Sequence, residues 1–117
     1  MQARFVEFGE IEIEKQRYDH DVVIEAGKVS KRKKGPSKQY RSQTGHTPLS
    51  VEEKIPWGGD QLIVGTGAYG RLPVMPEVEK EATRRGIKLV AVPTEEACRL
   101  LSDLKGKEVY AILHTTC

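Results

Sequence analysis

Three short, continuous apolar runs in the second half of the chain constrain its fold most. The runs are Leu62 to Val64, Leu89 to Val92 and Val109 to Leu113. Continuous apolar runs of this length are typical of strands that are covered on both faces of a parallel sheet. We therefore predict three central, mutually parallel strands over residues 61–65, 87–92 and 108–113.

Two helical patterns separate these runs. The first has Pro76 at its first position, acidic residues in its first turn, arginines in its last turn, and Gly86 as its terminator. The second is capped by Thr94, and one of its faces is apolar: Ala97, Leu100, Leu101 and Leu104. Right-handed crossovers place both helices on one face of the sheet unless the strand order reverses between them.

The first third of the chain predicts antiparallel strands. The alternation over residues 10–14 places Ile11 and Ile13 on one buried face, and further strands are expected over 20–25 and 28–32. The fold prediction is therefore an α/β protein, a single three-layer domain over residues 1–117 with a mixed sheet. Its parts are an N-terminal antiparallel meander (1–35), a loop-rich connection (36–60) and a C-terminal βαβαβ unit (61–117).

Composition limits the class of protein. A chain of 117 residues can bury one ordinary core, and no apolar run approaches the ~20 residues that a membrane helix needs. The N-terminus lacks an apolar signal segment, and Cys98 and Cys117 fit neither a disulfide framework nor a zinc site. We expect a soluble cytoplasmic protein. Asparagine is absent while Lys, Arg and Glu are plentiful, a bias found in thermophilic proteins.

The first apolar run leads into Gly65-Thr66-Gly67-Ala68-Tyr69-Gly70, which has the Gly-x-Gly-x-x-Gly spacing of dinucleotide-binding loops. In such loops a helix begins within the motif, but here Pro73 would fall inside its opening turns. The following strand also ends at Val92 without an acidic residue that could bind a ribose. We therefore expect no cofactor, and specifically no NAD, NADP or FAD.

The carboxyl ends of the parallel strands define a candidate cleft, because ligands of open α/β sheets bind there. Loops 65–71, 93–95 and 114–117 should converge at this edge. The candidate cleft residues are Gly65, Thr66, Gly67, Tyr69, Arg71, Pro93, Thr94, His114 and Thr115. Tyr69 with Arg71 could hold an anion, and His114 offers either a base or a hydrogen-bonded structural residue. We assign no catalytic residue, and three scattered histidines predict no metal site.

The strongest shift in composition is a basic run. No acidic residue occurs between Glu25 and Glu52, and that interval holds seven Lys or Arg residues, while the rest of the chain is net −5. The candidate basic patch consists of Lys31, Arg32, Lys33, Lys34, Lys38 and Arg41. Such a run either binds phosphates or is a solvated loop, and one short run on a chain of net charge +2 argues against nucleic-acid binding. After the basic run, Ser50 and Glu53 have the spacing of a capping box. This spacing predicts a short helical turn that Ser50 caps and to which Glu53 reaches back.

Five short motifs resemble a small family of mostly uncharacterised archaeal and bacterial domains. They are Tyr18-Asp19-His20-Asp21-Val22, Thr47-Pro48-Leu49, Gly65-Thr66-Gly67, Pro93-Thr94-Glu95-Glu96-Ala97 and Ile112-Leu113-His114-Thr115-Thr116-Cys117. The eukaryotic relatives of this family include an adipogenesis-associated protein and an assembly factor for mitochondrial respiratory complex I. The resemblance implies a three-layer α/β domain with a mixed sheet, and it implies no reaction, cofactor or catalytic residue.

Three hypotheses about function follow. The first is a cytoplasmic binding or assembly domain that holds a protein partner or a small anion in the cleft. The alternative is a small-molecule enzyme that uses the same cleft. The third is a nucleic-acid binder that uses the basic loop over residues 28–41. The sequence leaves the oligomeric state open.

Overall fold

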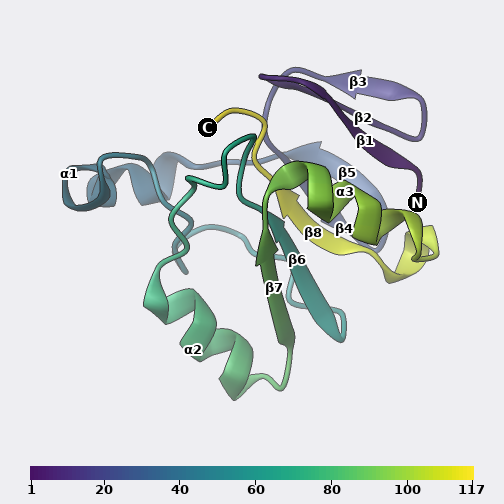
Figure 1. The fold of residues 1–117 in the computed structure, drawn as a ribbon. Coiled ribbons are helices and arrows are strands. Elements are labelled where there is room, and N and C mark those ends of the chain that lie inside the picture. Colours follow the sequence, from purple (N-terminus) through teal and green to yellow (C-terminus); the bar gives the residue numbers. More distant parts are fainter.

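The computed structural model describes residues 1–117 and contains two sheets (Figure 1). A three-stranded antiparallel sheet has the order β1-β2-β3: β1 (Ala3–Glu7), β2 (Glu10–Ile13) and β3 (Gln16–Tyr18). A five-stranded sheet has the order β5-β4-β8-β6-β7: β4 (Val22–Glu25), β5 (Lys28–Lys31), β6 (Gln61–Gly65), β7 (Lys88–Val92) and β8 (Tyr110–Leu113). The helices are α1 (Arg41–Thr44), α2 (Pro76–Arg84) and α3 (Thr94–Ser102), with 3₁₀ turns η1 (Gly35–Tyr40) and η2 (Gly106–Glu108).

The large sheet is mixed, as the sequence predicts. β6 pairs in parallel with both β7 and β8, whereas β4 pairs antiparallel with β8 and β5. The predicted α/β fold with three parallel strands is confirmed. The prediction that all three are central is wrong for β7, which forms an edge of the sheet. Its Leu89 and Val90 are accordingly only half-buried, because no strand covers its outer side.

Helices α2 and α3 cover opposite faces of this sheet. The chain moves outward from β6 to β7 and then crosses back over β6 to β8, so the strand order reverses and two right-handed crossovers fall on different faces. Val78 of α2 packs with Val64, whereas Leu101 of α3 packs with Ile63. Since neighbouring residues of a strand point to opposite faces, β6 supplies both cores.

The N-terminal meander divides between the two sheets, and its first strand, β1, was not predicted. Ile11 and Ile13 are buried as their alternation predicts, but β2 pairs with β1 and β3 in the small sheet. Glu14 and Lys15 have φ of 49° and 69°, which turns the chain back into β3. Only β4 and β5 join the large sheet.

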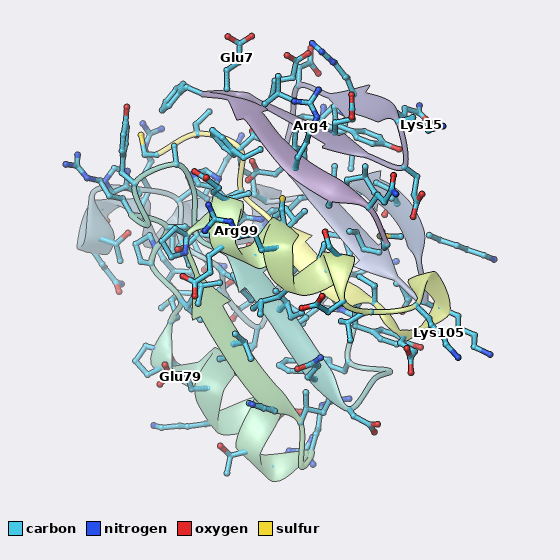
Figure 2. The ribbon with its side chains drawn as sticks, turned by 45° about the vertical axis from the view of Figure 1, so that its right-hand side comes forward. Arg4, Glu7, Lys15, Glu79, Arg99 and Lys105 are labelled. Carbon is cyan, nitrogen blue, oxygen red and sulfur yellow. The ribbon has the colours of Figure 1, made fainter.

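The result is three layers around the large sheet. The small sheet and α3 lie over one face, and α2 with the segment that carries Leu49 and Ile55 lies over the other (Figure 1). Figure 2 shows Glu7 at the outer edge of the small sheet and Glu79 on α2, at the opposite end of the molecule. None of the helices has the length and apolar character needed to cross a membrane.

Candidate functional site

The segment that follows β8 packs into the glycine loop that follows β6 (Figure 1). The backbone N–H of Ala68 donates to the carbonyl oxygen of Thr116 at 2.6 Å, and those of Tyr69 and Arg71 both donate to the oxygen of Cys117 at 3.1 Å. Gly67 has φ of +106°, and a Cβ there would lie 2.2 Å from the carbonyl carbon of Cys117. The loop therefore holds residues 116–117 with the same N–H groups that a phosphate would need.

Thr94 ties the three loops together from inside the protein. Its fully buried hydroxyl accepts the N–H of Gly67 at 2.8 Å and donates to the carbonyl oxygen of His114 at 2.6 Å. The prediction that Thr94 caps a helix is wrong, because Thr94 is the first residue of α3 and its side chain makes no cap bond. Gly65 packs directly against it, since a Cβ on Gly65 would lie 2.9 Å from the Thr94 Oγ1.

A buried ionic network lies behind these loops. Arg32 is only 4% exposed, and its Nε and Nη2 donate to the two carboxylate oxygens of Glu53, each at 2.8 Å. Its Nη1 donates to Asp21 Oδ2 at 2.9 Å, and Nη2 also donates to the carbonyl oxygen of Pro48. Arg32 therefore does not belong to the exposed basic patch, because two carboxylates hold it inside the protein.

Glu53 and Ser50 also have roles other than the predicted capping box. The carboxylate of Glu53 accepts the hydroxyl of Ser37 as well as the guanidinium of Arg32, and the hydroxyls of Ser37 and Ser50 lie 2.6 Å apart. Residues 51–53 form a turn and no helix. Capping-box spacing is a local signal, whereas the partners of Glu53 come from segments 16 and 21 residues away.

Asp21 connects this network to His114. Asp21 Oδ2 lies 2.8 Å from His114 Nδ1, and Asp21 Oδ1 accepts the backbone N–H of Thr115 at 2.9 Å and its hydroxyl at 3.2 Å. Burial alone would raise the pKa of the Asp21 carboxyl. The hydrogen bonds from His114 and Thr115 and the charge of Arg32 outweigh burial and hold that pKa well below its usual range. Asp21 is therefore an ionised, buried acceptor, which the sequence alone did not indicate.

His114 in turn contacts Thr116. Its Nε2 lies 3.2 Å from the Thr116 Oγ1. In the neutral imidazole, with the Nδ1 hydrogen donated to the ionised Asp21, Nε2 is an acceptor and can take a hydrogen bond from the Thr116 hydroxyl. The three side chains form a chain of hydrogen bonds from carboxylate to imidazole to hydroxyl.

A pocket of about 350 Å³ opens next to this chain, and we call it the cationic pocket. It is lined by Arg32, Lys34, Lys38, Arg41, Gly45, His46, Thr47, Arg71, Leu72, His114, Thr116 and Cys117. No acidic side chain lines it, and Lys34, Lys38, Arg41 and Arg71 take part in none of the ion pairs of the protein. Positive charge therefore accumulates there without an internal partner.

The structure thus groups the residues of the two predicted sites differently from the prediction. The cationic pocket joins Arg71 and His114 of the candidate cleft to Lys34, Lys38 and Arg41 of the basic run. The other cleft residues are placed differently: Thr66, Thr94 and Thr115 are buried, and Pro93 and Tyr69 are exposed. Lys31 and Lys33 line a separate, larger hollow of about 600 Å³ beside Trp57.

Tyr69 belongs to an exposed aromatic pair at the rim. It is 67% exposed, its ring centroid lies 6.0 Å from that of Phe8, which is 53% exposed, and the Arg71 guanidinium lies 5.7 Å from the Tyr69 ring. Phe8 comes from the turn between β1 and β2, a part of the chain that no sequence motif connected with the glycine loop.

The two cysteines should differ in reactivity. Burial on the inner face of α3, with the nearby charge of Glu95, raises the pKa of the Cys98 thiol to about 12, whereas Cys117 is partly exposed in the cationic pocket. We expect iodoacetamide to alkylate Cys117 in the native protein and to leave Cys98 free. Peptide mass spectrometry before and after unfolding in urea checks this. Equal labelling of both thiols in the native protein would contradict the packing of α3.

Known proteins share this architecture and part of this sequence. A model for the family described as "Protein of unknown function (DUF498/DUF598)" matches residues 4–114. The conserved hypothetical protein PH1505 from Pyrococcus horikoshii OT3 is 32% identical, with a TM-score of 0.80 and coverage of 100% of both chains. A protein named MT938 is 25% identical, with a TM-score of 0.63 and coverage of 98% of this chain and 99% of its own.

A third solved structure shows the fold alone. It is a protein from Bordetella pertussis, described as a Mth938-like domain, and it is 19% identical with a TM-score of 0.56. The match covers 97% of this chain and 86% of that one.

Proposed function

The chain belongs to the DUF498/DUF598 family of proteins of unknown function, and we propose that it is a binding domain that holds a small anion in the cationic pocket. The observation that carries the proposal is the set of four cations, Lys34, Lys38, Arg41 and Arg71, which share one pocket without any acidic side chain. By contrast, each of the six other arginines of the chain, Arg32 at the back of the pocket included, has an acidic side chain within 4.0 Å.

The chemistry of the lining favours an oxyanion. Like charges that are held close together repel one another, and an anion bound between them relieves that repulsion. Arg41 and Arg71 present planar guanidinium groups that match phosphate or carboxylate oxygens, and Lys34 and Lys38 supply point charges. Arg32 lies behind them and is already neutralised by Glu53 and Asp21, so it supports the pocket without binding the ligand.

Titration calorimetry with inorganic pyrophosphate tests the proposal. We expect saturable one-to-one binding that weakens as salt rises, and Arg41→Glu should weaken it at least about tenfold, since one favourable charge becomes a repulsive one. Lys80→Glu is the matched control: it makes the same change of charge on an exposed residue of α2, outside the pocket. No binding, or equal losses in both variants, would contradict the proposal.

A nucleic-acid role through residues 28–41 is weakened by the division of the basic run. Arg32 is buried, and Lys31 and Lys33 line a different hollow from Lys34 and Lys38. The same titration with short single-stranded DNA and RNA separates this role, because a phosphate-driven complex with many contacts should lose affinity steeply with salt. Binding to them that is tighter than to pyrophosphate would favour the nucleic-acid role.

An assembly role is the second candidate, and the exposed aromatic pair favours it. Tyr, Phe and Arg are enriched in the buried centres of protein interfaces, and Phe8, Tyr69 and Arg71 lie together at the surface. The resemblance to a mitochondrial assembly factor agrees with such a role. A reducing cytoplasm is the expected location, since both cysteines are free thiols.

A further inference from the structure

We propose that Asp21, His114 and Thr116 form a hydrolytic centre that cleaves small carboxylic esters bearing an anionic group, with Thr116 as the nucleophile. This inference rests on the proposed function, because the cationic pocket would hold the anionic group of the ester. Three distances carry it: 2.8 Å from Asp21 to His114, 3.2 Å from His114 to Thr116, and 2.9 Å from Asp21 to Arg32.

The roles of the three side chains follow from their hydrogen bonds. The Thr116 Oγ1 lies 3.2 Å from Nε2 of His114, so with a neutral imidazole the hydroxyl donates to Nε2, which is the arrangement that activates a hydroxyl nucleophile through a neighbouring base. Asp21 accepts from Nδ1, which fixes the tautomer of the imidazole and stabilises the imidazolium that forms when His114 takes a proton.

Asp21 is held firmly enough to orient the imidazole. Its two oxygens accept from Arg32, from His114 and twice from Thr115, and its side chain is only 10% exposed. A carboxylate fixed in this way cannot rotate away from His114 without losing several charge-assisted hydrogen bonds. Asp21 is therefore a positioning residue, whereas His114 and Thr116 face the pocket and would touch the substrate.

The lining of the pocket defines the class of substrate. His114 and Thr116 share it with Lys34, Lys38, Arg41 and Arg71, so a reactive carbonyl at Thr116 and an anionic group among the cations fit the same hollow of about 350 Å³. The same cations would stabilise the negative charge that develops on the carbonyl oxygen during attack. An ester with a carboxylate or phosphate group a few atoms from the scissile bond meets both requirements.

The reaction would run in two halves. Thr116 Oγ forms a bond to the ester carbonyl carbon while its proton moves to His114 Nε2, and collapse of the tetrahedral intermediate breaks the bond to the leaving alcohol, which takes that proton. Water then attacks the acyl-threonine and gives a proton to Nε2. The second collapse breaks the acyl–Oγ bond, returns the proton to Oγ and releases the carboxylic acid.

The test uses 4-acetoxybenzoate, an acetyl ester with a carboxylate on the far side of a rigid ring, and its neutral methyl ester as the comparison. We expect the wild-type protein to hydrolyse the anionic ester faster than the neutral one. Thr116→Ala and His114→Gln should each lower the rate at least about a hundredfold, and Thr116→Ser should retain activity. Quenched samples should carry an acetyl group on the peptide that contains Thr116.

Two controls separate catalysis from structure and from binding. Thr83→Ala removes an exposed hydroxyl on α2 and should leave the rate unchanged. Thr116→Ala should still bind pyrophosphate, which shows that it is folded and that the pocket is intact. Acetylation only on lysines or on Cys117, or equal rates for the wild type and Thr116→Ala, would overturn the inference. A wild-type protein that binds pyrophosphate but hydrolyses neither ester would overturn the inference and leave the proposed function standing, whereas a wild-type protein that does neither would remove both.

Discussion

Replacing Glu53 with alanine is expected to lower the free energy of unfolding by about 3 to 5 kcal/mol. The change removes both hydrogen bonds from Glu53 to Arg32 and leaves a guanidinium that is 4% exposed with only Asp21 to balance its charge. It also removes the carboxylate that accepts the buried hydroxyl of Ser37 and leaves that hydroxyl with Ser50 alone as a partner. A loss of this size is a large part of the stability of an ordinary domain, and unfolding in urea measures it.

Glu52→Ala is the matched control, because Glu52 is the neighbouring acidic residue and is exposed. Its carboxylate accepts the hydroxyl of Tyr40, at 2.8 Å on the surface, so its removal should change stability by less than about 0.5 kcal/mol. Similar losses for the two variants would show that Arg32 is not held inside by Glu53.

Gly67→Ala is expected to destabilise the protein by about 3 to 5 kcal/mol. The backbone φ of +106° costs a residue with a side chain about 1 to 3 kcal/mol. The new Cβ would also lie 2.2 Å from the carbonyl carbon of Cys117, so residues 116–117 must move. That movement breaks their three hydrogen bonds to the glycine loop, each worth about 0.5 to 1.5 kcal/mol.

Gly86→Ala separates backbone strain from the lost packing. Gly86 also has positive φ, at +69°, but a Cβ there meets nothing within 4 Å. Its replacement should cost only about 1 kcal/mol, measured by the same unfolding in urea. Equal costs at Gly67 and Gly86 would mean that residues 116–117 do not pack into the glycine loop.

The local elements of the fold can be read from the sequence alone. Pro76 begins α2 and Gly86 follows its end, because proline fits a helix start and glycine adopts the left-handed conformation past a helix end. The apolar runs became β6, β7 and β8, and the alternation around Ile11 and Ile13 gave β2 its buried face. These signals are readable because each depends on residues that are close together in the chain.

Only the tertiary structure decides which basic side chains lack an acidic partner. It also decides where the candidate site lies. Arg32 stands in a run of lysines, yet it is buried because Glu53 and Asp21 reach it from segments 21 and 11 residues away. Asp21 and His114 are 93 residues apart and meet only because β4 pairs with β8, where Val22 faces Leu113. Burial and the pairing of charges depend on which strands become neighbours in space, and no local pattern of residues encodes that choice.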